Sequence, residues 1–225
     1  MVLALGASLG AAMAAEPTTQ TPPTKETIVV AVRLAPPGPP GQKAFAYHVG
    51  DAKTIPEGDS DALAAALRAV CEGRVQRAPG GAGRMEFAVE VQAERDARWS
   101  AVAPVFKAAA AAKIPEMILV AGGRRISAPL PEAGRTSVKA QPNPIRIILR
   151  PAGKESEGVV MQLSGHEMAP TDLPAAMAKL REQAGEGAGN SLVIIQPDGR
   201  VRWEHVVTAY HHVQERGFRL IGFAP

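Results

Sequence analysis

Cysteine is almost absent from this chain of 225 residues, which contains only Cys71. A single cysteine excludes an intramolecular disulfide and a zinc site built from several thiolates. Cys71 falls on a segment that is predicted to be helical, and no companion base is evident near it in the sequence. We therefore expect a small, half-buried side chain at this position and not a reactive thiol.

Aromatic residues are scarce, and the N-terminal apolar stretch is short. Phe, Trp and Tyr make up 4% of the chain, so the core must be built from Ala, Val, Leu and Ile. Residues 1–15 carry no charge but are fewer than the ~20 residues that a membrane-spanning helix needs. They are predicted to be a signal peptide with an Ala12-Met13-Ala14 cleavage site, although no positive charge precedes them. The alternative is a disordered Ala/Gly-rich tail.

The net charge of +3 resides outside the predicted domains. Residues 122–144 hold four basic residues against one glutamate, and their Gly and Pro content is typical of an interdomain linker. The remaining sequence is close to neutral, whereas nucleic-acid binding requires a basic face on a domain. Residues 16–27 are rich in Pro and Thr and are predicted to be a disordered tether.

The C-terminal part predicts a strand, a turn, a helix and a second strand. Leu192–Ile195 is a short apolar run typical of a strand, and Gly199 of the following turn is expected to adopt a positive φ. Gly217 stands where a left-handed C-terminal helix cap belongs, and the strand Leu220–Phe223 follows it. The helix between them has an apolar face formed by Trp203, Val206, Val207, Tyr210 and Val213.

The first half of the chain repeats the element order of the second half. Ser60 and Thr171 are predicted to cap the first helix of each unit. The corresponding apolar residues are Phe45/Tyr47/Val49 with Val159/Met161/Leu163, Leu63/Leu67/Val70 with Leu173/Met177/Leu180, and Trp99/Val102/Phe106 with Trp203/Val206/Tyr210. These sets are 114, 110 and 104 residues apart, because the first half has longer loops. We predict an α+β fold with two tandem β-β-α-β-α-β units, residues 28–121 and 145–225, that can pack as a pseudo-dimer.

The two predicted units differ on one strand. Ala88 and Glu90 of the first unit correspond to Leu192 and Ile194 of the second, 104 residues later. The strand of the first unit therefore has one polar face, whereas the strand of the second is apolar on both faces. We predict that this face of the second unit is covered, by the first unit or by another chain. A charge at Ile194 should then disturb assembly or stability, and Glu90 should tolerate change.

The second unit resembles the periplasmic domain of the ExbD/TolR biopolymer-transport family. The segments that carry the resemblance are Ile145–Leu149, Leu163-Ser-Gly-His166, Thr171-Asp-Leu173, Leu192–Ile195 with Pro197-Asp198, Val206-Val207 to Tyr210, and Arg216-Gly217-Phe218. The first unit is similar to a more diverged member of the family. The resemblance implies a periplasmic or secreted protein that binds itself, envelope transport proteins or peptidoglycan.

The chain departs from that family in two respects. Members usually carry one such domain behind a membrane helix whose aspartate takes part in proton flow, and neither the helix nor the aspartate is evident here. No proton-channel role is therefore expected. The pairing that the family achieves as a dimer is expected to occur within one chain.

No catalytic motif, cofactor motif or metal motif is present. His205 and His212 are two helical turns apart, too far to share one ion, and His211 lies beside them. The pairs Arg98-Trp99 and Arg202-Trp203 suggest either a sugar or cation–π platform or, in our preferred interpretation, core anchors. Residues 79–83 are Gly-rich but lack the Lys-Ser/Thr of a phosphate loop. We therefore predict no catalytic residues, no cofactor-binding residues, no metal ligands and no enzymatic activity.

Three functional hypotheses follow. The first is a non-enzymatic cell-envelope binding or scaffold protein associated with biopolymer transport or envelope maintenance. The second is a small-ligand-binding protein or enzyme on an α+β scaffold, which would need a concave pocket with converging polar groups. The third is a structural pseudo-dimer without a ligand.

Overall fold

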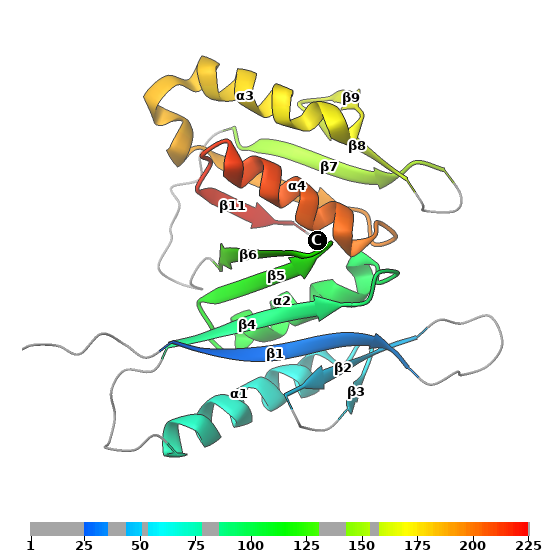
Figure 1. Cartoon of the computed structure of the whole chain (residues 1–225), viewed down its shortest axis with the longest axis vertical. Coiled ribbons are helices and arrows are strands. Elements are labelled where there is room, and N and C mark those ends of the chain that lie inside the picture. The colour runs from blue at the N-terminus through cyan, green and yellow to red at the C-terminus, as the bar shows by residue number, and fades with distance from the viewer. Residues whose placement is uncertain are drawn as a thin grey trace, which may run out of the picture.

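The chain folds into two units of mixed α+β structure, as predicted, that lie one above the other in Figure 1. The structure is a computed structural model that describes residues 25–35, 44–50, 54–77, 86–130, 143–153 and 158–224. The predicted signal peptide 1–15 and the Gly-rich segment 79–83 lie outside these described residues.

The first unit is a mixed sheet of six strands with two helices. Its elements are β1 (Lys25–Leu34), β2 (Phe45–Val49), β3 (Thr54–Pro56), α1 (Ser60–Arg77), β4 (Glu86–Ala93), α2 (Trp99–Ala111), β5 (Glu116–Ala121) and β6 (Arg124–Pro129). The strand order is β3-β2-β1-β4-β5-β6. Strands β1, β4 and β5 run parallel, and β2, β3 and β6 are antiparallel to their neighbours.

The second unit is a mixed sheet of five strands with two α-helices and two 3-10 helices. Its elements are β7 (Ile145–Pro151), β8 (Val159–Leu163), β9 (His166–Met168), η1 (Pro170–Asp172), α3 (Leu173–Ala184), η2 (Gly185–Asn190), β10 (Leu192–Pro197), α4 (Trp203–Glu215) and β11 (Leu220–Phe223). The strand order is β11-β10-β7-β8-β9. Strands β7, β10 and β11 run parallel, and β8 and β9 complete an antiparallel meander.

The two sheets agree in strand order and also in register. Val91 pairs with Leu119 across β4 and β5, and Ile195 pairs with Phe223 across β10 and β11, with both partners shifted by 104 residues. The meanders agree as well, at offsets of their own: Val32 pairs with Tyr47 in the first sheet, and the equivalent Leu149 pairs with Met161 in the second. Because a slip of one residue would turn every side chain to the other face, equal registers place equivalent residues on equivalent faces.

The helices cover one face of each sheet, and the residues between them form one continuous core. Helices α1 and α2 pack on the first sheet, and α3 and α4 pack on the second (Figure 1). Leu63 and Leu67 of α1 are fully buried, as are Leu173 and Met177 of α3. The apolar periodicity of the sequence therefore identified the inward face of both helices correctly.

Several predicted boundaries need correction. Each unit has a third meander strand, β3 or β9, which the sequence analysis missed because three residues are too few to show periodicity. Residues 124–129, assigned above to the linker, form β6, whose inward Ile126 and Ala128 are buried. Strand β1 begins at Lys25, within the predicted tether.

The helix caps and one turn also differ from the prediction. The carboxylate of Asp59, and not the hydroxyl of Ser60, accepts the N–H of Ala62 at 2.9 Å at the start of α1. Thr171 lies inside the 3-10 turn η1 and does not cap α3. Gly199 does not adopt a positive φ, whereas Gly217 does, at +82°, as predicted for a helix C-terminus.

Candidate functional site

The two units meet through a reciprocal pair of backbone hydrogen bonds. The N–H of Trp99 donates to the carbonyl of Val201 at 2.8 Å, and the N–H of Trp203 donates to the carbonyl of Ala97 at 2.8 Å. Both donors and both acceptors are 104 residues apart, so equivalent residues exchange equivalent bonds. This is the pattern of a contact about a two-fold axis, here within one chain.

An aromatic cluster forms the core of this junction. The indoles of Trp99 and Trp203 stack with ring centroids 6.2 Å apart and an interplanar angle of 15°. Phe106 packs against both indoles, and Phe223 packs against Trp99. The two phenyl rings also contact each other, with centroids 5.0 Å apart. The exposed fractions of Trp99 and Trp203 are 5% and 1%. These indoles are therefore core anchors, because a buried ring offers no face to a sugar or a cation.

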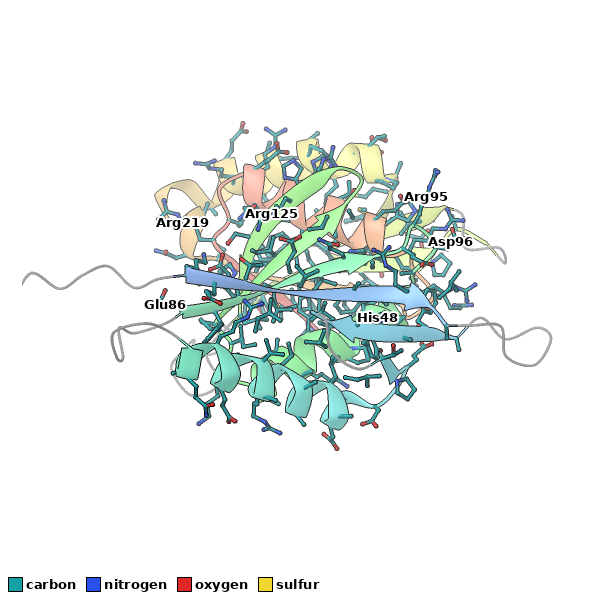
Figure 2. The ribbon with its side chains drawn as sticks, turned by 60° about the horizontal axis from the view of Figure 1, so that its bottom comes forward. His48, Glu86, Arg95, Asp96, Arg125 and Arg219 are labelled. Carbon is teal, nitrogen blue, oxygen red and sulfur yellow. The ribbon has the colours of Figure 1, made fainter. Side chains whose placement is uncertain are left out.

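A cleft of about 420 Å³ opens beside Trp203 at the edge of this junction. We call it the junction cleft. Its lining residues follow β4, end β5 and begin α4: Ala93, Glu94, Arg95, Ala121, Gly122, Trp203 and Glu204. In Figure 2, Arg95 lies beyond one end of β4 and Glu86 lies at the other end. The cleft is thus at the carboxyl ends of two neighbouring parallel strands, where α/β sheets commonly bind ligands.

The cleft exists because the junction is closed on one side only. At the closed side, the N–H of Ser100 donates to the carbonyl of Gly199 at 3.0 Å. The Cβ of Ser100 lies 3.4 Å from where a Cβ on Gly199 would stand, so small residues allow this close approach. The equivalent residues on the other side are Glu204 and Arg95, and no hydrogen bond joins their backbones in the described part of the chain.

The carboxylates at the two sides of the junction differ in their hydrogen-bond partners. Asp198 at the closed side accepts two bonds from the Arg200 guanidinium, at 3.0 and 3.1 Å, and one from its N–H at 2.9 Å. The side-chain hydrogen bonds from Arg200 hold the pKa of Asp198 below its usual value. Glu94 occupies the equivalent position in the cleft, and its carboxylate has no partner among the described residues. The same holds for the carboxylate of Glu204.

The second unit, which this junction joins to the first, is similar to a known family. Residues 122–225 match the family model of biopolymer transport protein ExbD/TolR. The matched residues include β6 and the whole second unit, just under half of the chain. No curated protein and no solved structure matches the chain. Within the residues that the structure describes, no helix combines the length and the apolarity needed to cross a membrane.

The ExbD/TolR-like second unit differs from the first on the sheet face opposite its helices. In the first sheet, Glu90 on this face is only 9% exposed, and its carboxylate accepts the Arg125 Nε–H at 2.9 Å and the Gln92 amide at 2.7 Å. The sequence did not indicate these partners, and they argue against the expectation that Glu90 tolerates change. In the ExbD/TolR-like unit the equivalent Ile194 is half-buried.

His211 and His212 of α4 form a small polar cluster with Glu215 that the sequence did not predict. His211 Nε2 lies 3.2 Å from one oxygen of Glu215, and His212 Nδ1 lies 3.4 Å from the other. The spacing of four residues from His211 to Glu215 places both side chains on one face of α4, where they meet. Among the described residues, no group of three His, Cys, Asp or Glu side chains is arranged to hold a metal ion.

Cys71 lies on α1 and is half-buried, as expected. Burial raises the pKa of its thiol, and this outweighs the opposing effect of the nearby Arg74. A thiol with a raised pKa is less ionised at neutral pH and therefore less nucleophilic.

Glu94, Arg95 and Glu204 were not singled out from the sequence. The signal for them was present at the offset of 104 residues, where Asp96 replaces Arg200 and Glu204 replaces Ser100. These replacements remove the partner that satisfies Asp198 and the small side chain that closes the junction. Only the structure, however, places the three residues around one cavity.

Proposed function

We propose that this protein is a non-enzymatic cell-envelope binding or scaffold protein of biopolymer transport, with two ExbD/TolR-like units in one chain. The observation that carries the proposal is the family match of residues 122–225. Its site of action would be periplasmic, and its partners would be envelope transport proteins or peptidoglycan.

The inclusion of the first unit rests on its agreement with the second. The parallel strands β4 and β5 have the register of β10 and β11 at one constant offset, and the meanders agree at their own offsets. Two unrelated folds can share a strand order by chance, but they are much less expected to share the pairing registers of their strands as well. A duplicated unit explains both, as well as the reciprocal contact between Trp99 and Trp203.

A partner surface is supported by the outer face of the second sheet. Its half-buried aliphatic residues are Ile148, Val160, Leu192, Ile194 and Leu220, with the exposed Arg146 and Arg150 beside them on β7. The equivalent face of the first sheet instead has ion pairs between Arg125 and Glu90 and between Lys25 and Glu116. An apolar face with a charged border is the composition of a protein interface.

Site-specific photo-crosslinking of the full chain in its own host tests this proposal. A crosslinker at Ile148 should capture an envelope transport protein, whereas one at Ala31, its equivalent 117 residues earlier, should not. A protein that acts on peptidoglycan should co-sediment with purified sacculi. A chain that fractionates with the cytoplasm, with no envelope crosslink from Ile148 and no binding to sacculi, would overturn the proposal.

A further inference from the structure

The junction cleft has the size, position and unpaired charges of a binding site. Its volume of about 420 Å³ lies within the ~300–1,000 Å³ of small-molecule sites, and it is located between two units. Trp203 lines the cleft, and its position is fixed because its side chain is 1% exposed and its Nε1–H donates to the carbonyl of Val120 at 3.1 Å. The polar side chains of the lining, and not the buried face of the indole, are therefore the groups that a ligand would meet.

The equivalent position on the other side of the junction serves as an internal comparison. There, Asp198 is satisfied by Arg200, and Gly199 and Ser100 close the space. Folding and pairing of the two units therefore do not require an open cleft or unpaired carboxylates. The half-buried Glu94 and Glu204 leave charge without a protein partner in the described residues, an arrangement that stability alone does not favour.

The charges around the cleft restrict the chemistry of its ligand. Two carboxylates, Glu94 and Glu204, repel a simple anion. The guanidinium of Arg95, exposed at the same cleft, adds one positive charge that a simple cation would leave without a partner. A molecule with an ammonium group and a carboxylate satisfies all three side chains.

We propose that the junction cleft binds a short zwitterionic peptide. Its ammonium group lies against Glu94 and Glu204, and its carboxylate lies against Arg95. The cleft has room for more than one amino acid, which favours a dipeptide over a free amino acid. This assignment rests on the geometry of the junction and not on the proposed role in transport, so either can fail without the other.

The two tryptophans provide a direct readout. In a ¹H–¹⁵N spectrum of the full chain, each indole N–H gives one signal, and the chain has only two tryptophans. Titration with alanyl-alanine should move the Trp203 indole signal saturably and leave the Trp99 signal in place, because only Trp203 lines the cleft. Separate titrations with alanine, putrescine and inorganic phosphate should give weaker shifts or none.

Variants connect the shift to the named side chains. Glu94→Gln and Glu204→Gln should each weaken alanyl-alanine binding roughly tenfold, the usual effect of losing one charged hydrogen bond. Asp198→Asn, the matched change at the closed side, should not alter binding. The double variant Arg95→Gly/Glu204→Ser, which copies the closed side, should abolish binding while the Trp99 signal reports an intact fold.

Three results would overturn the proposal. The first is the absence of any Trp203 shift at high alanyl-alanine concentration. The second is a shift that Glu94→Gln and Glu204→Gln leave unchanged. The third is an equal shift with putrescine or with phosphate, which would mean that one charge alone is recognised and that the ligand is not a zwitterion.

Discussion

The guanidinium of Arg181 occupies the space that a side chain on Gly217 would need. Arg181, on α3, donates from Nη1 to the carbonyl of Arg216 at 2.8 Å, just beyond the C-terminus of α4. A Cβ on Gly217 would stand 2.7 Å from the same Nη1 atom. The pair thus joins α3 to the end of α4 and satisfies a carbonyl that the helix leaves without an internal partner.

Gly217→Ala should destabilise the protein by about 1–2 kcal/mol, because the φ of +82° is unfavourable for alanine and Arg181 must move away. Thermal or denaturant unfolding measures the change. Gly187→Ala is the matched control, since Gly187 has no positive φ and a Cβ there meets nothing within 4 Å. An equal effect of both changes would contradict this account of Gly217.

Trp203→Phe should cost more stability than Trp99→Phe. The Trp203 indole donates to the carbonyl of Val120, and phenylalanine would leave this carbonyl without that donor and the core with a smaller ring. We expect about 2–4 kcal/mol for Trp203→Phe and at least ~1 kcal/mol less for Trp99→Phe. Denaturant unfolding of both variants is the measurement, and equal losses would show that the indole hydrogen bond contributes nothing.

The first sheet should lose stability in acid through Glu90. The hydrogen bond from Gln92, followed by that from Arg125, lowers the pKa of Glu90 below the value of 4.5 for a free carboxyl. A lowered pKa stabilises the folded state above pH 4.5, and this contribution is lost as the pH falls through the folded-state pKa. Glu90→Gln should therefore show a smaller fall in melting temperature between pH 7 and pH 3 than the unchanged protein.

Glu116 is a suitable comparison for that experiment. Burial raises the pKa of its carboxyl, but hydrogen bonds from Lys25 and Ser127 outweigh burial and lower the pKa overall. Glu116→Gln should reduce the acid sensitivity in the same direction. If neither variant differs from the unchanged protein in its pH dependence, the ion pairs of this sheet face do not contribute to stability.

Both tyrosines of the chain should resist ionisation in alkali. Burial, together with the charge of Glu57, raises the pKa of Tyr47 to about 12, and burial raises the pKa of Tyr210 to about 12. Because the folded-state pKa exceeds the unfolded value of 10.0, the stabilisation is complete below pH 10 and is lost towards pH 12. Phenolate absorbance should therefore stay low at pH 11 in the folded protein. A titration with a pKa near 10 would contradict the burial of these rings.

The sequence predicted the features that depend on apolar periodicity. The inward faces of α1, α3 and α4, and the repeat offsets of 104 and 114, were readable because core side chains recur at fixed spacings. The left-handed cap at Gly217 was readable because few other residues tolerate that backbone conformation. The partner of Glu90 could not be predicted, because Arg125 lies on β6, a strand in the segment that the sequence assigned to the linker.

The junction cleft could not be predicted in the same way. The described residues show no backbone hydrogen bond between Glu204 and Arg95, whereas the equivalent residues Ser100 and Gly199 are joined by one. The cleft is recognised only when these two sides of the junction are compared. Periodicity reports which face of an element is buried, but it does not report how closely two elements approach. That distance is set by side-chain volume at a few contact positions.

The contact between Trp99 and Trp203 joins two parts of one polypeptide. This determines how many copies of each surface one molecule presents. Two separate identical subunits would present every surface twice and would separate on dilution. Here the connecting chain keeps the units together at any protein concentration. Within the described residues the junction cleft belongs to one side of the junction and the apolar sheet face to one unit. A molecule that bound a partner at each surface, as we propose, would therefore give the resulting assembly a defined polarity.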